Sequence, residues 1–365
     1  MSVAYPEGTF NLDAPIRQES DAVYEGAGIG KTILKTNGQL FAHFIAIGEA
    51  ENPLRNITVR NMTLDGGVSV PDKTKGYHAW YVDYCDGIVF ENVECINLWS
   101  CATHMRRSNN IEIRNIKTKN TWTGVCLWTV KNAKVHHSII DTTHGDGAYL
   151  GYVYPCSLGP AGKYPNREAC EAAGGYWRGF TNPINQHIEF AYNELYNIGD
   201  TGLGSIDISS QTTPIMNNDD VQIHHNLIDG GNPFSRSCTP NATGIAIGLS
   251  TNSRIHHNIT KNMFPTTIQV DGCPHARGTP YPGGVGIHVG HFYYPPNNTY
   301  INDNTIINCD YENRNGHISA WQGDPNCLPP ENIYGNIINP SPLPFRDDFL
   351  NLNKWKIING AWTTV

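Results

Sequence analysis

The chain has 365 residues, of which 39% are hydrophobic and 16% are charged, and its formal net charge is −8. This length and apolar content suffice for one large domain. The acidic balance and the lack of a basic run argue against nucleic-acid binding. The sequence has no apolar stretch of about 18 residues, so no membrane span is predicted. The 36 glycines and 23 prolines are typical of a turn-rich all-β protein.

A short phrase recurs along the chain. It consists of an aliphatic, a polar and a second aliphatic residue, then two or three polar residues rich in Asn and His, then a further aliphatic residue. Alternation with period two indicates strands, and several copies lie roughly 22 to 34 residues apart, which is typical of a solenoid. The sequence therefore predicts a parallel β-helix, in which each coil packs against its neighbours. The copies lie at 57–64, 88–95, 111–118, 133–140, 188–195, 221–228, 254–260, 300–306 and 333–338.

The polar part of each phrase predicts a corner. Asn tolerates left-handed backbone, and Asn residues stacked on successive coils can form an amide ladder. The corner asparagines are Asn61, Asn92 and Asn115, then one place later Asn193, Asn226, Asn258, Asn304 and Asn336. Three histidine pairs occupy the same place in other copies, so we interpret them as corner residues, with metal binding as the alternative. These pairs are His136-His137, His224-His225 and His256-His257.

An insertion interrupts the repeat at about residues 153–180. Residues 166–173 read as a short helix capped by Asn166, and Cys156 and Cys170 bracket the segment, so we expect them to pair. The insertion either walls a binding cleft or is a surface loop. The weaker pairings are Cys238 with Cys273 and Cys309 with Cys327, whereas Cys95 reads as a buried free thiol.

Ten cysteines favour an oxidising compartment, although the chain begins without a secretory signal. We therefore expect a secreted or cell-surface protein whose signal peptide is not in this sequence. Residues 1–340 are expected to form the β-helix catalytic domain. Residues 341–344 read as a linker, and the rest of 341–365 reads as the truncated start of a β-sandwich module.

The Asn-punctuated repeats, with Gly8-Thr9-Phe10 and the glycine-rich segment 26–30, resemble the right-handed parallel β-helix superfamily of pectate-lyase-like proteins over about residues 5–340. The resemblance implies an all-β fold and an activity among polysaccharide lyases, glycoside hydrolases, uronate epimerases and phage tailspikes. The motif sets of polygalacturonases and the Asp-Pro-His motif of mannuronan epimerases are missing. The size of the unit, its cysteines and its tail also resemble the disaggregatases, envelope-polysaccharide enzymes of methanogenic archaea.

A second short strand precedes each phrase, and period two assigns its residues to the inside or the outside. Asp83, Arg106 and Trp128 are expected to align on successive coils, as are Tyr81, His104 and Cys126. Acid, base and aromatic groups together are what a sugar site needs, so we predict an active cleft there; the alternative is a salt-bridged surface or an oligomer contact. The predicted catalytic residues are Asp83, His104, Arg106, Asp146 and Asp207, and the predicted substrate-binding residues are Tyr81, Trp128, His144, Tyr149, His288 and His317.

Two reactions fit these residues. A hydrolase needs two carboxyl groups, with Asp83 beside Arg106 as the base and Asp146 or Asp207 as the acid. A lyase would neutralise a uronate carboxylate with Arg106 and His104 or His288, and would take the C5 proton with Tyr81, Tyr149 or His104. Hydrolysis of a uronate- or amino-sugar-containing polysaccharide is slightly favoured. We predict that no cofactor and no bound metal are required. Ca²⁺ is the alternative group that could neutralise the uronate carboxylate. A non-catalytic carbohydrate-binding β-helix remains a third hypothesis, and a homotrimer is compatible with the sequence.

Overall fold

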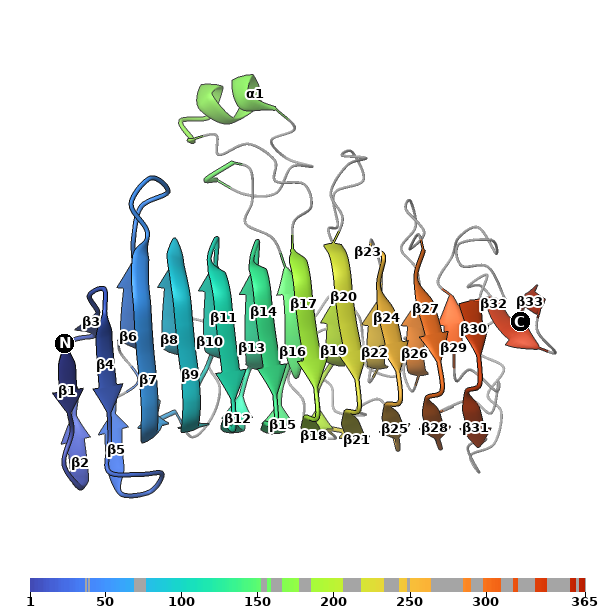
Figure 1. Cartoon of the computed structure of the whole chain (residues 1–365), viewed down its shortest axis with the longest axis horizontal. Helices are drawn as coiled ribbons and strands as arrows, with labels where there is room; N and C mark the ends of the chain where they lie inside the picture. The colour runs from blue at the N-terminus through green and yellow to red at the C-terminus, as the bar shows by residue number, and fades with distance from the viewer. Residues whose placement is uncertain are drawn as a thin grey trace.

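The computed structural model describes most of the chain from residue 1 to residue 364. Strands dominate, and the described part contains one helix (Figure 1). No helix in this part is long and apolar enough to cross a membrane. The described residues are 1–36, 38, 40–68, 77–151, 156–158, 166–176, 185–205, 218–232, 243–247, 250–263, 285–289, 298–309, 318–320, 332–339, 355–358 and 361–364.

The strands stack in coils along the long axis of the molecule, from the amino terminus to the carboxyl terminus (Figure 1). One 12-stranded sheet, here the first sheet, is parallel throughout except at its last two strands. It consists of β3 (Ile16–Arg17), β6 (Ala42–Ile47), β8 (His78–Asp83), β10 (Cys101–Arg106), β13 (Thr123–Trp128), β16 (Ala148–Gly151), β19 (Thr201–Ser205), β22 (Thr243–Ile247), β26 (Val285–Val289), β29 (Ile318–Ala320), β32 (Trp355–Ile358) and β33 (Ala361–Thr364).

A 21-stranded parallel sheet, here the second sheet, completes each coil. It bends at the corner of the repeat phrase, so that most coils contribute one strand on either side of the corner. Its strands are β1 (Ser2–Ala4), β2 (Gly8–Asn11), β4 (Ala22–Glu25), β5 (Thr32–Lys35), β7 (Leu54–Asp65), β9 (Cys85–Ile96), β11 (Asn109–Arg114), β12 (Lys117–Thr121), β14 (Lys131–His136), β15 (Ile139–Thr143), β17 (Gln186–Ala191), β18 (Glu194–Ile198), β20 (Asn218–His224), β21 (Leu227–Gly231), β23 (Ser250–Thr251), β24 (Arg254–His256), β25 (Ile259–Lys261), β27 (Tyr300–Asn302), β28 (Thr305–Ile307), β30 (Ile333–Tyr334) and β31 (Ile337–Asn339).

The corners confirm the predicted asparagine ladder. The amide nitrogen of Asn226 donates to Oδ1 of Asn258 at 3.0 Å, and Asn258 donates in turn to Asn304 at 2.9 Å. The ladder extends to Asn193 at one end and Asn336 at the other. The residue before each ladder asparagine has a positive φ, as at Asp303, where it is 57°, and in an earlier coil an asparagine, Asn115, holds this place with a φ of 52°. Asn is therefore used both for left-handed backbone and for coil-to-coil bonding.

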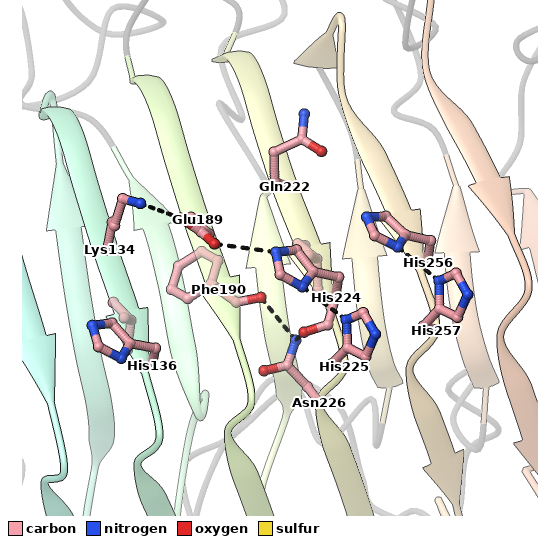
Figure 2. Close-up of polar contacts among 12 residues, drawn as sticks. Lys134, His136, Glu189, Phe190, Gln222, His224, His225, Asn226, His256 and His257 are labelled. Carbon is pink, nitrogen blue, oxygen red and sulfur yellow. Dashed lines mark hydrogen bonds and ion pairs between the residues drawn. The ribbon is translucent and has the colours of Figure 1, made fainter.

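The histidine pairs are corner residues, as predicted. His225 and His257 both have φ of 55°, and their rings stack with centroids 5.0 Å apart. The preceding residues, His224 and His256, also stack at 5.0 Å (Figure 2). His224 Nε2 lies 3.2 Å from a carboxylate oxygen of Glu189 on the neighbouring coil. We call the outward face of β14, β17, β20 and β24 the ladder face.

The interior is a continuous apolar column, and it fixes which residues of the first sheet point outward. Val82, Met105, Leu127 and Leu150 are each at most 1% exposed, as predicted for the inward set. At the start of the strands, glycines stack on successive coils. A Cβ on Gly147 would lie 2.5 Å from the carbonyl oxygen of Gly202 on the next coil, so no larger residue fits there.

The insertion and the tail are described in part. Helix α1 (Arg167–Ala172) begins after Asn166, whose side chain accepts a hydrogen bond from the Ala169 amide at 2.8 Å. The predicted Cys156–Cys170 disulfide is formed, and Cys95 is a buried free thiol. The other pairings involve cysteines outside the described residues. In the tail, β32 and β33 form an antiparallel hairpin whose first strand pairs with β29. The β-sandwich module stays a prediction.

Candidate functional site

Three columns of side chains cross the outward face of the first sheet on β8, β10, β13 and β16, which we call the site face. Arg106 aligns with Asp83 on one side and with Trp128 on the other, as predicted. His104 likewise aligns with Tyr81 and with Cys126, and Cys126 aligns with Tyr149. The third column lies at the start of the strands, where Cys101 aligns with Thr123. Successive coils from β8 to β16 have nearly equal lengths, which produces this alignment.

The predicted pairing of Asp83 with Arg106 is wrong. Asp83 is 5% exposed, and both of its carboxylate oxygens accept hydrogen bonds from Arg107, one of them at 2.7 Å. Arg107 has a φ of 42°, which places its side chain beside Asp83, and its guanidinium lies 4.1 Å from the Tyr84 ring centroid. A carboxylate held in this way stabilises the fold and is not placed to serve as a base.

Arg106 bonds instead to the neighbouring coil, where Nη1 donates to the Tyr81 hydroxyl. Burial raises the pKa of Tyr81, which is 9% exposed, although the Arg106 charge opposes this rise. Tyr81 is therefore a poor base at neutral pH. Arg106 itself is partly exposed, and its Nε is buried without a hydrogen-bond partner among the described residues.

His104 lies inside a cage of rings. The ring centroids of Trp128, His78 and Tyr81 lie 4.6, 5.0 and 5.5 Å from the His104 ring. Neither nitrogen of His104 has a hydrogen-bond partner within the part of the chain that the structure describes. Burial, and after it the nearby His78, lowers the pKa of His104 well below its ordinary value, so the imidazole is neutral at pH 7.

Two thiols that the sequence analysis did not assign to the site lie beside this histidine. Cys101 and Cys126 are both buried and free, and their thiols are hydrogen-bonded to one another. That bond, and then one with His78, lowers the pKa of Cys101, whereas burial raises the pKa of Cys126. The pair therefore releases its first proton from Cys101.

Asp146 is the second carboxyl group considered in the candidate site. Its Oδ1 accepts a hydrogen bond from the Thr201 amide at 3.2 Å, and the adjacent Asp200 donates its own amide to the carbonyl of Gly145 at 2.9 Å. The Asp146 side chain is partly exposed, yet protein atoms enclose it from most directions. This burial, followed by the charge of Asp200, raises the pKa of Asp146 well above its ordinary value. The two carboxyl groups thus lie on successive coils, and the charge of Asp200 favours the protonated form of Asp146.

Aromatic rings lie on both sides of Asp146. Before the strands, Trp99 and Trp122 lie with ring centroids 4.9 Å apart, and Trp122 stacks on His144 at 6.5 Å. At the far end of the strands, the Trp128 indole covers Gly151, where a Cβ would lie 2.4 Å from Nε1. Flat apolar rings flanking a carboxyl group suit the faces of sugar rings.

The structure brings together eight of the predicted site residues but not all of them. Asp207 and His317 lie outside the described residues, as does the side chain of His288, whose backbone aligns with Ala246. The strand of this coil that the structure describes is β19, at Thr201–Ser205. Those brought together on the site face and in the turns that lead into it are Tyr81, Asp83, His104, Arg106, Trp128, His144, Asp146 and Tyr149.

The site residues that sequence reasoning missed lie mostly in the turns or at the first positions of the strands. His78 and Cys101 begin β8 and β10, and Trp99, Trp122 and Asp200 precede strands. Alternation does not extend into turns. Only the alignment of successive coils could have identified them. For example, Trp122 occupies the same place as Ser100 in the preceding coil, directly before a strand of the first sheet.

Comparisons with known proteins show the fold. No family model and no curated protein matches the chain. Among solved structures, a mannuronan C-5 epimerase A-module of Azotobacter vinelandii is 12% identical, with a TM-score of 0.56 over 95% of this chain and 87% of that one. An alginate lyase of a Paenibacillus species is also 12% identical, with a TM-score of 0.54 over 92% and 96% of the two chains. A polygalacturonase of Erwinia carotovora is 12% identical, with a TM-score of 0.52 over 93% and 85%. This chain therefore has the parallel β-helix fold of pectate-lyase-like and polygalacturonase-like proteins.

Proposed function

We propose that the protein hydrolyses glycosidic bonds in an extracellular or cell-envelope polysaccharide. The observation that carries this proposal is the pair of carboxyl groups, Asp146 and Asp200, on successive coils between two sets of aromatic rings. Glycoside hydrolysis needs one carboxyl group that donates a proton and another that activates water or attacks the sugar. Two neighbouring carboxyl groups, one of them with a raised pKa, meet that need.

Asp146 is assigned as the general acid. Its raised pKa favours the protonated form, so it can protonate the oxygen of the leaving sugar. Asp200 is assigned as the ionised partner that acts as base or nucleophile. Trp122 and Trp128 would stack on sugar rings on either side of the cleaved bond. This assignment replaces Asp83, which is held by Arg107.

Similar folds are found in proteins named as an epimerase, a lyase and a polygalacturonase, which is compatible with a polysaccharide substrate. A lyase is the second candidate, because Arg106 on the site face offers a positive charge for a uronate carboxylate, next to the phenol of Tyr81. Under that alternative, Ca²⁺ or Arg106 would neutralise the carboxylate. Secretion agrees with the Cys156–Cys170 disulfide.

The test is to incubate the protein with a panel of uronate-containing and amino-sugar polysaccharides. Reducing ends and the ultraviolet absorbance of unsaturated uronates are followed in the same samples. Hydrolysis produces new reducing ends without absorbance, and this is the expected result. If both signals rise together, the reaction is a β-elimination and the lyase replaces the hydrolase. If a polymer binds but neither signal changes, the protein is a carbohydrate-binding β-helix and not an enzyme.

A further inference from the structure

Three donor atoms that the proposed hydrolysis does not use converge on the site face. They belong to His78, Cys101 and His104, and one donor atom from each lies within 4.8 Å of the other two. The three residues are 6%, 6% and 9% exposed, so the cluster is buried. Within the described part of the chain, no other group of three histidine, cysteine or acidic side chains meets in this way.

The backbone of the β-helix holds the three residues in place. Cys101 and His104 lie three residues apart on β10, and His78 lies on the adjacent strand β8. Thr103 aligns with Trp80, and Cys101 and His78 each lie two residues before these partners, so they stack on successive coils. Strands position ligands more rigidly than loops do, so the cluster is preorganised.

The two histidines present unsatisfied nitrogens to this cluster. Both ring nitrogens of His104 and Nδ1 of His78 are buried and have no hydrogen-bond partner among the described residues. Buried polar groups are nearly always hydrogen-bonded, and leaving them unsatisfied costs free energy. The aromatic cage of Tyr81 and Trp128 supplies no acceptor in their place. A bound cation would satisfy one nitrogen of each histidine, since a neutral imidazole has one ring nitrogen with a free lone pair.

We propose that His78, Cys101 and His104 bind a transition-metal ion, with Zn²⁺ as the best fit. Zn²⁺ prefers imidazole nitrogen and thiolate sulfur at about 2.0 to 2.3 Å in tetrahedral sites. Cys126, whose thiol interacts with that of Cys101, is a candidate donor for a fourth position. Ca²⁺ and Mg²⁺ prefer oxygen ligands and do not suit this set. The inference goes beyond the proposed hydrolysis, because it involves neither Asp146 nor Asp200.

The test uses the full chain without an affinity tag, stripped with a chelator and kept reduced. Zn²⁺ is titrated in against a chromophoric competitor, and Co²⁺ is titrated in parallel. One tightly bound ion per chain is expected, with a sulfur-to-cobalt charge-transfer band in the near ultraviolet. Zn²⁺ should also raise the unfolding temperature, because a ligand that binds only the folded state stabilises it. The absence of the thiolate band in the folded wild type would overturn the proposal without any variant.

Variants then locate the site. Cys101→Ser and His104→Gln should each weaken Zn²⁺ binding by at least about tenfold, since even indirect supports of metal ligands cost that much. Cys95→Ala, which removes a buried thiol from the second sheet, is the matched control and should bind normally. His257→Gln on the ladder face should also bind normally. Loss of affinity in His257→Gln alone, or unchanged affinity in both Cys101→Ser and His104→Gln, would overturn the assignment. All these readouts are independent of activity on any polymer.

Discussion

The site face and the ladder face belong to one β-helix, but their polar side chains differ in how they are hydrogen-bonded. On the ladder face, Lys134 pairs with Glu189 at 2.9 Å, and Glu189 also bonds His224 at 3.2 Å (Figure 2). On the site face, His104 and Trp128 bury ring nitrogens that have no hydrogen-bond partner within the described chain. Buried polar groups are nearly always hydrogen-bonded in a folded protein. We therefore interpret the unpaired ring nitrogens of the site face as groups that serve function and not stability.

The first prediction tests by activity whether the site face is the catalytic face. Asp146→Asn keeps the size of the side chain and the oxygen that accepts the Thr201 amide, but it cannot donate a carboxylic proton. We expect turnover to fall by about 10² to 10⁴-fold, the usual contribution of a general acid, while the affinity for the polymer changes little. Initial rates of reducing-end release, together with binding measured on the same polymer, check this expectation.

The matched control is Asp229→Asn, a carboxylate that pairs with Lys261 on the second sheet at 3.0 Å. It should retain the wild-type rate.

Tyr81→Phe separates the two reactions, because it should slow a lyase strongly and a hydrolase only slightly. Equal loss in Asp146→Asn and Asp229→Asn would mean that the site face is not the catalytic face.

The second prediction concerns the ion pair on the site face. Asp83→Asn leaves the Arg107 guanidinium, which is 17% exposed, without its counter-charge. Removal of one partner from a buried ion pair is strongly destabilising, so we expect a loss of about 3 kcal/mol in the free energy of unfolding. Glu189→Gln on the ladder face should cost about 1 kcal/mol or less, because Glu189 and its partner Lys134 are more exposed. Urea unfolding of both variants measures the difference. A loss of turnover without a loss of stability in Asp83→Asn would restore Asp83 as a catalytic residue.

The third prediction tests the ladder as a scaffold. Asn226 donates to the Phe190 carbonyl at 2.9 Å and accepts from the Asn193 amide at 3.0 Å. Asn226→Ala leaves these buried groups unpaired, and we expect a loss of about 2 kcal/mol. Ser138 fills the equivalent place in an earlier coil, so Asn226→Ser should lose less. Thermal or urea unfolding ranks the two variants; the reverse order would mean that the side-chain amide is not what holds the coils together.

The sequence predicted the scaffold better than the site, for a physical reason. Period-two strands and left-handed Asn corners are local features, and identical coils repeat them, so Asn226 and its ladder could be predicted. The alignment of Asp83, Arg106 and Trp128 followed from the constant coil length. The choice of Arg107 as the partner of Asp83 could not be predicted, because it depends on a positive φ at one non-glycine residue. Trp122 lies in a turn, outside the alternation that assigns residues to a face.

The smallest expected effect concerns the acid sensitivity of the ladder face. Burial, followed by the charges of His224 and Arg254 and of the adjacent His257 and His225, lowers the pKa of His256 to about 4. Above about pH 6.5, its ordinary value, His256 is neutral in both the folded and the unfolded chain, so its stabilising contribution is constant. As the pH falls from about 6.5 to about 4, the unfolded chain binds a proton that the folded chain refuses, and stability falls. Because the ring is partly exposed, we expect the loss to be about 1 kcal/mol. His256→Gln should therefore become more stable relative to wild type between these two pH values and should show a constant difference above pH 7. Stability curves that stay parallel throughout this range would mean that His256 does not carry the acid sensitivity.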